Sequence, residues 1–229
     1  MGFATGVKKI QQATASKGNA DFPRRLKLED GDQIVLRIIN EFDVDSPNYE
    51  ESRGLAGVVR QHTSPHLWYK KAECTMEDYG QCYACEQAQR FAGVNDDMAK
   101  KWRSKQRLYF NVLAKNDEGE DTVFYWDTST YRSSVYDTLW EYFLDTNSVS
   151  NRPWKLKRKG GGQNDTTYLI MAQAEDKKPF DWPADIKPYP LEDLVPTIEY
   201  DKQAEFYGAP MPVDDESDAD ESSESLAWV

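Results

Sequence analysis

The chain has 229 residues, a formal net charge of −12 and 39% hydrophobic residues. This suffices for one domain of ordinary size with appendages and is too short for two full domains. No uncharged apolar stretch approaches the roughly 20 residues that span a bilayer, which excludes a transmembrane protein. The N-terminus has no apolar run after a basic start, so we expect no secretory signal and a cytoplasmic location.

The first third of the chain begins with a polar arm. Residues 1–22 carry Lys8, Lys9 and Lys17 among small polar side chains, and we expect a flexible basic arm there. Residues 31–40 follow a turn and are rich in β-branched side chains, which predicts the first strand. A second strand is expected to end near residue 62.

The segment at about 62–105 alternates poorly between apolar and polar residues. It contains all three cysteines and both histidines of the chain. We therefore predict a small insertion here. Residues 107–129 then show two alternating runs around a polar turn that contains glycine, which predicts a β-hairpin.

The last elements are a helix and a second pair of strands. Residues 133–144 place Val135, Leu139 and either Tyr142 or Phe143 at helical spacing after a serine, Ser133 or Ser134, that can cap the first turn, which predicts an amphipathic helix. Residues 152–171 predict a basic strand, a glycine turn and a returning strand. A proline-rich stretch follows, and a short helix is expected near 201–206.

Five or six short strands in hairpins, with one helix among them, fit a small closed barrel of the oligonucleotide-binding (OB) kind. The fold class is therefore mainly β, of the α+β type. We predict an OB-fold-like core over 23–207 that carries the insertion, followed by a disordered acidic tail over 208–229. The same pattern equally allows another small barrel.

The cysteines and histidines have the spacing of a metal site. Cys82 and Cys85 are separated by two residues, so that two thiolates can reach one tetrahedral ion from a tight turn. Cys74 lies eight positions upstream, and the histidines precede it. We predict one structural zinc ion held by three thiolates and one imidazole, from Cys74, Cys82, Cys85 and His62, with His66 as the alternative to His62.

Two other interpretations of these residues remain open. The cysteines can be small reduced core residues and the histidines surface residues, as is common in cytosolic proteins. A zinc-dependent nucleobase deaminase would need a His-x-Glu element and a Pro-Cys-x-x-Cys element. Here His62 is followed by Thr-Ser, and Gln81 precedes the cysteine pair. Because the glutamate that would act as general acid and base is missing, we expect no enzymatic activity.

Basic residues alternate with aromatic residues in three places. Single-stranded nucleic acid needs this mixture, because cations pair with phosphates while unstacked bases lie on flat rings, each worth about 1–3 kcal/mol. For any one ring, ordinary packing in the core is an equally good explanation. The candidate DNA contacts are Trp68, Tyr69, Lys70, Lys71, Lys100, Lys101, Trp102, Arg103, Lys105, Arg107, Tyr109, Trp154, Lys155, Lys157, Arg158 and Lys159.

The C-terminal segment is acidic and ends in an apolar sequence. Residues 213–229 contain seven acidic and no basic residues, more than half of the net charge, and finish in Leu-Ala-Trp-Val. Such a segment is predicted to be disordered. We expect it to bind partner proteins and to compete with DNA for the basic residues; a tail that only improves solubility is the alternative. The residues expected to bind partners are Asp214, Asp215, Glu216, Asp218, Asp220, Glu221, Glu224 and Trp228.

Taken together, these motifs resemble the T-even bacteriophage type of single-stranded DNA-binding protein. The segments that carry the resemblance are VVRQH (58–62), WYKKAEC (68–74), CYAC (82–85), RLYFNVLAKNDEGE (107–120), VYDTLWEYF (135–143) and WKLKRKGGGQNDTTYLI (154–170). The resemblance implies an OB barrel with an inserted zinc loop, in which His62 and the three cysteines are the ligands. It also implies a basic aromatic cleft for DNA and an acidic tail that contacts replication partners.

On this basis we expect a non-catalytic protein that coats single-stranded DNA without reading its sequence, during replication, recombination and repair. Its expected partners are DNA polymerase, helicase-primase or recombinase, bound through the tail, and further copies of itself along the DNA. If a phage encodes the chain, the location is the host cytoplasm. The alternative is a zinc-containing adaptor between proteins of the replication or transcription machinery.

Overall fold

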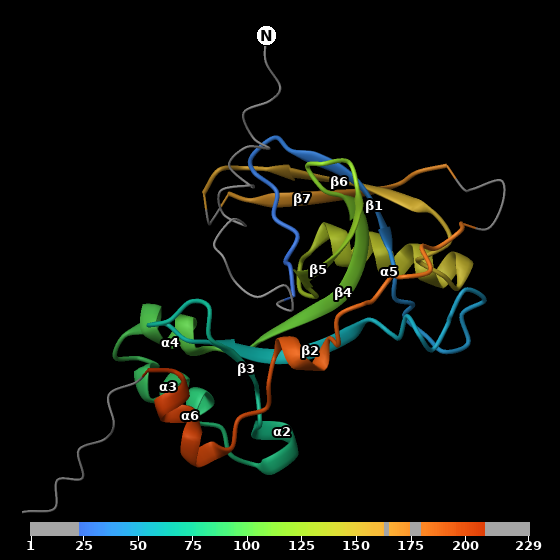
Figure 1. Ribbon diagram of the computed structural model, residues 1–229. Helices are drawn as coiled ribbons and strands as arrows, with labels where there is room; N and C mark the ends of the chain where they lie inside the picture. The colour runs from blue at the N-terminus through green and yellow to red at the C-terminus, as the bar shows by residue number, and fades with distance from the viewer. Residues whose placement is uncertain (1–22, 163–164, 175–179, 209–229) are drawn as a thin grey trace, which may run out of the picture.

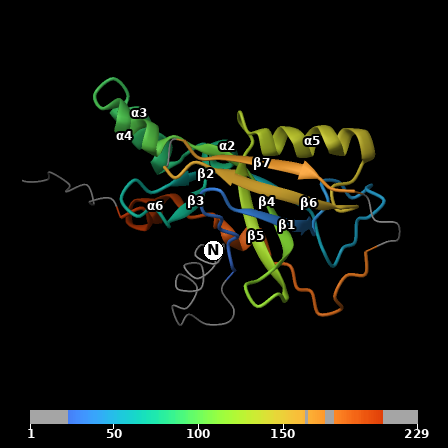
Figure 2. The same ribbon diagram turned by 90° about the horizontal axis from the view of Figure 1, so that it is seen from above.

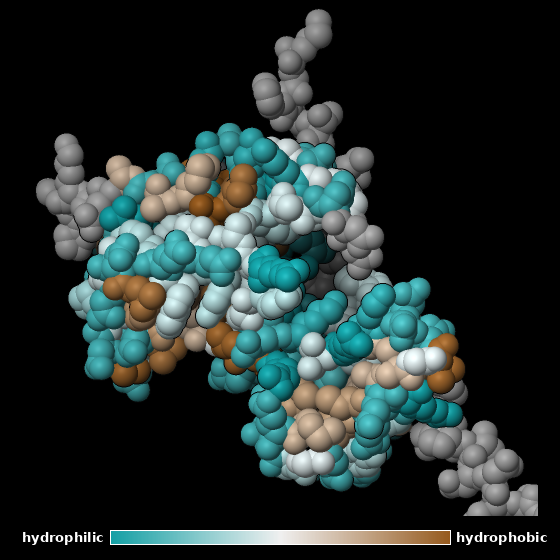
Figure 3. All heavy atoms as spheres, turned by 180° about the vertical axis from the view of Figure 1, so that it is seen from behind, coloured by the Kyte–Doolittle hydropathy of each residue, from teal (hydrophilic) through white to brown (hydrophobic). Residues whose placement is uncertain are grey.

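The computed structural model describes residues 23–162, 165–174 and 180–208 (Figure 1). The predicted basic arm over residues 1–22 and the acidic tail from residue 209 onward lie outside the described residues. Within them, strands and helices form a larger lobe around one apolar core and a smaller lobe around a second. Seen from behind, the surface is hollowed between the two lobes, and strongly hydrophilic residues border the hollow (Figure 3).

The larger lobe is built on an antiparallel sheet. Its path runs β3-β2-β4-β1-β6-β7, with β5 paired to β4. The long strand β4 organises the sheet: β5 pairs along its whole length on one edge, whereas β2 and β1 share the other edge. The strands are β1 (Gln33–Ile38), β2 (Gly57–Thr63), β3 (Lys71–Glu73), β4 (Lys105–Lys115), β5 (Asp121–Ser129), β6 (Pro153–Lys159) and β7 (Thr167–Ala172).

The prediction of a mainly β, α+β protein is confirmed, whereas the expected closed barrel is wrong. Strands β3 and β7 end the path and do not pair with each other, so the sheet stays open. Among the described residues, the free edge of β5 receives one isolated parallel bridge, from Arg25 to Tyr125. Hairpin count and strand length predict that a sheet forms, but closure depends on which distant edges meet, and this has no signature in local sequence.

The predicted hairpin and helix are both present. Strands β4 and β5 are joined by a turn in which Gly119 has a φ of 82°, a conformation that costs glycine little. Helix α5 (Ser134–Thr146) begins where expected, because the Ser133 side chain accepts a hydrogen bond from the Tyr136 amide. Its apolar side packs on the sheet core through Val135, Leu139 and Phe143.

The predicted insertion forms most of the smaller lobe. It contains β3 and three short helices, α2 (Met76–Tyr79), α3 (Tyr83–Phe91) and α4 (Asp96–Trp102). The sequence analysis did not predict these helices, because each is too short to show a sustained helical period. Helix α3 packs against Trp102 at the end of α4, and this indole lies edge-on to the rings of Tyr83 and Tyr207.

The C-terminal part of the described chain ties the two lobes together. Residues 180–197, here called the strap, run over the face of the sheet that points away from the core. Phe180 lies under the guanidinium of Arg37, at 3.8 Å, and the Asn111 side chain exchanges two hydrogen bonds of 3.0 Å with the Tyr189 backbone. The strap includes the 3-10 helix η1 (Glu192–Leu194) and leads into the predicted short helix, α6 (Tyr200–Phe206).

Helix α6 and the residue after it form hydrogen bonds that hold the smaller lobe together. The Gln203 side chain accepts a hydrogen bond from the Tyr83 amide at 2.9 Å and donates one to the Thr75 hydroxyl at 3.0 Å. The Ser64 hydroxyl donates to the carbonyl oxygen of Tyr207 at 2.7 Å. The start of α3 is therefore held by a segment about 120 residues further along the chain. In the described part of the chain, every helix is too short or too polar to cross a bilayer.

Candidate functional site

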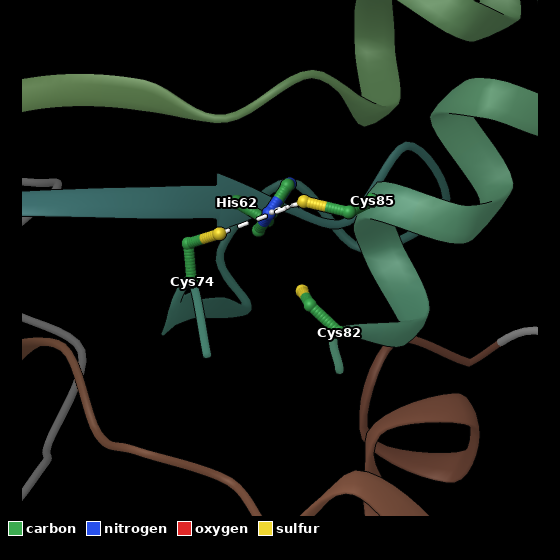
Figure 4. Close-up of side chains that lie close together, drawn as sticks. All are labelled: His62, Cys74, Cys82 and Cys85. Carbon is green, nitrogen blue, oxygen red and sulfur yellow. Dashed lines mark hydrogen bonds between the residues drawn. The ribbon is translucent and has the colours of Figure 1, made fainter. Parts of the chain in front are cut away.

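Four side chains that could bind a metal converge in the smaller lobe. His62 lies on β2, Cys74 directly follows β3, Cys82 caps the start of α3, and Cys85 lies in the first turn of that helix. Their potential ligand atoms all lie within 4.8 Å of one another. The side chains point toward a common centre (Figure 4). These are the four residues predicted from the sequence, and together they could hold one metal ion.

The distances between these atoms fit a tetrahedral ion with thiolate ligands. The Cys74 and Cys85 sulfur atoms are 3.5 Å apart, and the Cys85 sulfur is 3.4 Å from Nε2 of His62. With zinc–sulfur bonds of about 2.3 Å, tetrahedral geometry separates two sulfur ligands by about 3.8 Å. Three thiols and one imidazole form a complete ligand set, and they leave no position for a substrate or a reactive water. The donor set therefore fits a structural zinc ion.

A backbone contact orients the imidazole. Nδ1 of His62 lies 2.6 Å from the carbonyl oxygen of Trp102. A carbonyl oxygen only accepts hydrogen bonds, so Nδ1 carries the proton and the lone pair of Nε2 faces the sulfur atoms. His66 is not part of this group: its ring packs edge-on against Trp102, with centroids 6.1 Å apart. The geometry thus favours His62 over His66 as the fourth ligand.

The three thiols differ in their tendency to ionise. Burial opposes ionisation of Cys82, but the contact with the His62 imidazole and hydrogen bonds from the backbone at Cys85 and Thr75 outweigh it and lower the pKa of this thiol to about 6. Burial raises the pKa of Cys74 and of Cys85, and hydrogen bonding to Cys74 raises that of Cys85 further. The start of α3 also favours negative charge at Cys82 and Cys85. Cys82 is therefore the thiol best prepared to bind a cation.

A second cluster of charged residues lies on the sheet face that points away from the core. The Asp127 carboxylate, whose side chain is 1% exposed, accepts hydrogen bonds from Arg25, at 2.7 Å, and from Arg107. Burial opposes ionisation of Asp127, but Arg107, Arg25 and Lys71 outweigh it and lower the pKa of this carboxyl group. Three cations thus surround one carboxylate, so the group keeps an excess of positive charge.

Two tyrosine rings adjoin these charges. Tyr109 pairs with Asp127 in the β4–β5 register, and its ring stacks on Tyr125 with centroids 6.5 Å apart and planes at 24°. Its hydroxyl donates to Gln61 of β2 at 2.6 Å. Tyr109 is buried, whereas Tyr125 is half-buried. We call these rings and charges the Asp127 cluster; its members are Arg25, Lys71, Arg107, Tyr109, Tyr125 and Asp127.

The structure separates the predicted DNA contacts into different places. Lys71, Arg107 and Tyr109 belong to the Asp127 cluster, but Tyr109 is buried, so its ring cannot stack on a base as predicted. Trp102 and Trp154 are buried in the smaller and the larger core respectively. Neither indole can stack on a base, so the prediction that they contact DNA is wrong. Each indole fills the core of its lobe. The burial of a ring cannot be inferred from the basic residues next to it in the sequence.

The other predicted contacts are mostly accessible. Trp68 and Tyr69 are exposed on the turn between β2 and β3, and Lys70 lies over the ring of Phe206 at 5.3 Å. The Arg158 guanidinium donates to the Leu28 carbonyl oxygen and to Thr166, so it serves the fold. The remaining cations lie on α4, at its end, or on exposed ends of strands: Lys100, Lys101, Arg103, Lys105 and Lys159.

The two lysines in the middle of β6 do not adjoin the Asp127 cluster. Lys155 and Lys157 pair with Val35 and Gln33 of β1, and they share the sheet face that carries the cluster. Between them and the cluster runs the strap, which contacts β1 at Arg37 and β4 at Asn111. The basic strand and the basic cluster are therefore two separate surfaces.

Sequence analysis missed half of the Asp127 cluster. Arg25 lies in a short segment outside any strand, and Tyr125 and Asp127 lie in the second arm of the hairpin. The pairing of the two arms of the hairpin could have predicted their place in the cluster, because it puts Tyr125 and Asp127 on the same face as Arg107 and Tyr109. No local pattern places Arg25 beside β5. The predicted partner-binding residues of the tail, from Asp214 to Trp228, lie outside the described residues.

No protein-family model matches the sequence of this chain, and no curated protein matches it significantly.

Proposed function

We propose that this chain binds single-stranded DNA without sequence specificity and has no catalytic activity. The observation that carries the proposal is the excess of cations around Asp127. One buried carboxylate holds Arg25 and Arg107 in place and lies near Lys71, beside the stacked rings of Tyr109 and Tyr125. Phosphates need fixed cations and unpaired bases need flat apolar faces; the cluster offers the cations and, in the half-buried Tyr125, one such face.

Asp127 has a positioning role in this proposal. Without a carboxylate between them, the two guanidinium groups would repel each other and spread into solvent. With it, they stay in one orientation and retain donors for a phosphate. The half-buried ring of Tyr125 and the exposed rings of Trp68 and Tyr69 are the proposed stacking surfaces. In place of the expected OB-type barrel, the surface proposed to bind DNA is one face of an open sheet.

The metal centre stabilises the lobe on one side of this surface. His62 on β2 and Cys74 after β3 hold the strand pair that carries Gln61 and Lys71. A zinc ion, when bound, supplies ligand bonds that couple folding of the smaller lobe to metal binding. The ion thereby fixes the position of Lys71, without taking part in chemistry.

The acidic tail completes the proposal. Its seven carboxylates would compete with DNA for the cations of the Asp127 cluster, and its apolar end would bind replication enzymes such as a polymerase, helicase-primase or recombinase. DNA bound at the cluster would displace the tail, and the displaced tail would then be available to partner proteins. Replication, recombination and repair are the processes in which such a protein works, and a phage origin fits the motif resemblance.

Titration with oligo(dT) tests the proposal. Binding should change the intrinsic tryptophan fluorescence, and the logarithm of the affinity should fall linearly with the logarithm of salt concentration, with a slope of about −0.7 per contacted phosphate. A duplex of the same length is the control and should bind more weakly. If oligo(dT) does not bind at low salt, the proposal is wrong, and a zinc-containing adaptor between proteins becomes the better interpretation.

A further inference from the structure

One flank of α5, beside the face that packs on the sheet core, carries a row of apolar side chains, and Tyr136 and Phe42 also pack partly against that core. Tyr136, Trp140 and Leu144 follow one another at intervals of one helical turn, and the first two rings stack with planes at 6° and centroids 6.3 Å apart. Phe42, from the loop after β1, stacks on Trp140 at 6.4 Å. Trp140 is 41% exposed and Leu144 is 65% exposed. We call these four residues the α5 stripe.

Acidic residues border the stripe. Asp137, Glu141 and Asp145 follow one position after each stripe residue and are all exposed. On the loop that supplies Phe42, Asp43 and Asp45 are exposed as well, and the Asp45 carbonyl oxygen accepts a hydrogen bond from the side chain of Asn147 at the end of α5. Helix α5 contains no lysine or arginine. Among the described residues, none of these five acids forms an ion pair.

Of the three acids on α5, only Asp137, in the first turn, lies where the helix dipole favours negative charge. Like charges four residues apart repel each other, as Asp137, Glu141 and Asp145 do. Asp145 lies in the last helical turn, where the helix dipole favours cations, and that turn has no basic residue. A partner that brings cations to the border of the stripe would turn each of these unfavourable interactions into a favourable one, while its apolar residues would cover Trp140 and Leu144.

From this complementarity we infer that the α5 stripe is a docking surface for a basic amphipathic helix of another protein. Apolar residues spaced by one turn on α5 match apolar residues spaced by one turn on a partner helix. The acidic border repels nucleic acid and anionic membranes, which distinguishes this surface from the Asp127 cluster. Helix α5 also lies at the opposite end of the molecule from α3 and α4 (Figure 2). The inference is therefore independent of the proposed DNA binding.

A synthetic helix tests this inference on the full-length, metal-loaded protein. The probe is a fluorescently labelled peptide of 18 residues, with leucines along one helix face and lysines elsewhere. A scrambled peptide of the same composition is its control. The ordered peptide should bind at least about tenfold more tightly than the scrambled one, and Leu144→Ala or Glu141→Gln should each weaken its binding by about tenfold.

Matched variants on other surfaces control for nonspecific attraction. Leu169→Ala removes another exposed leucine, on β7, and Glu205→Gln removes an exposed glutamate from α6. Neither should change the affinity by more than about twofold. Equal binding of the two peptides, or equal effects of Leu144→Ala and Leu169→Ala, would overturn the inference. So would self-association of the protein that Leu144→Ala abolishes, because the surface would then join copies of this chain.

Discussion

Nδ1 of His62 donates a hydrogen bond of 2.6 Å to the carbonyl oxygen of Trp102. This contact joins the metal-binding face of β2 to the end of α4, which lies 40 residues further along the chain. It sets the imidazole tautomer and keeps Nε2 available to a metal ion. The bond also explains why the buried indole of Trp102 lies beside the centre: the residue supplies both an acceptor for the ligand and the largest side chain of the smaller core.

The choice between the two histidines leads to a first prediction. His62→Ala should weaken zinc binding by at least about tenfold, because one of four ligands is lost together with its orienting contact. His66→Ala should leave zinc binding unchanged, since this ring contacts Trp102 and not the sulfur atoms. Competition with a chromophoric chelator measures both affinities. Loss of zinc from His66→Ala and retention by His62→Ala would reverse the assignment.

Removal of the metal should affect one lobe. Chelation leaves three thiols and an imidazole around an empty centre, and the small core of Trp102, Tyr83 and Tyr207 has few other supports. Hydrogen exchange should therefore accelerate in residues 71–102 and 200–207, while the amides of β4 and β5 keep their protection. Equal acceleration in both lobes would show that the protein folds as one metal-dependent unit.

Asp127→Asn should destabilise the protein at neutral pH. The substitution leaves Arg25, Arg107 and Lys71 close together without their carboxylate. The loss should be about 3 kcal/mol, at the lower end for a broken buried pair, because Arg25 is 39% exposed and screened by water. Chemical denaturation of both proteins measures it.

The same pair of proteins also predicts a pH dependence. The pKa of Asp127 is lowered in the folded protein, so its contribution to stability is fully present above the unfolded pKa of about 3.9. That contribution is lost as the pH falls through the lower, folded value. The stability difference between wild type and Asp127→Asn should therefore be constant from pH 5 to 7 and shrink below pH 4. A difference that grows with acidity would contradict the assignment of Asp127 as the buried anion.

Individual cations of the Asp127 cluster should contribute separately to DNA affinity. Arg25→Ala removes the most accessible guanidinium of the cluster and should reduce the salt slope of oligo(dT) binding by about 0.7. Lys157→Ala is the matched control, because it removes a cation from the same face of the sheet beyond the strap. A reduced slope in Lys157→Ala but not in Arg25→Ala would place the DNA on β6.

Deletion of residues 213–229 should tighten oligo(dT) binding. The segment carries seven acidic residues and no basic ones, and its competition for the cluster should be strongest where screening is weakest. We therefore expect the gain in affinity to be largest at low salt and to fade above about 0.3 M. A version of the tail in which the acids are replaced by their amides serves as the control for length. Unchanged affinity at all salt concentrations would rule out the competition.

Local sequence patterns predicted the elements and the four candidate metal ligands, but not how distant segments meet. The strands show clear alternation, and α5 shows helical spacing after a capping serine. The Cys-x-x-Cys spacing indicated a metal site, to which Cys74 and the histidines could then be added. Barrel closure, by contrast, depends on edges far apart in the chain. Trp102 and Trp154 were misassigned because basic neighbours suggested an exposed ring, whereas tertiary packing buried each. Arg25 was not predicted as a site residue, because it lies 102 positions from Asp127 in the sequence and reaches it only in the folded protein.

Photo-crosslinking provides the most direct test of DNA binding at the Asp127 cluster. An oligo(dT) in which bromodeoxyuridine replaces single thymidines is irradiated in complex with the protein, and the crosslinked residues are identified by mass spectrometry. The account predicts crosslinks at Tyr125 and in the turn that holds Trp68 and Tyr69. Crosslinks confined to β6 and β7, or none under saturating conditions, would contradict it.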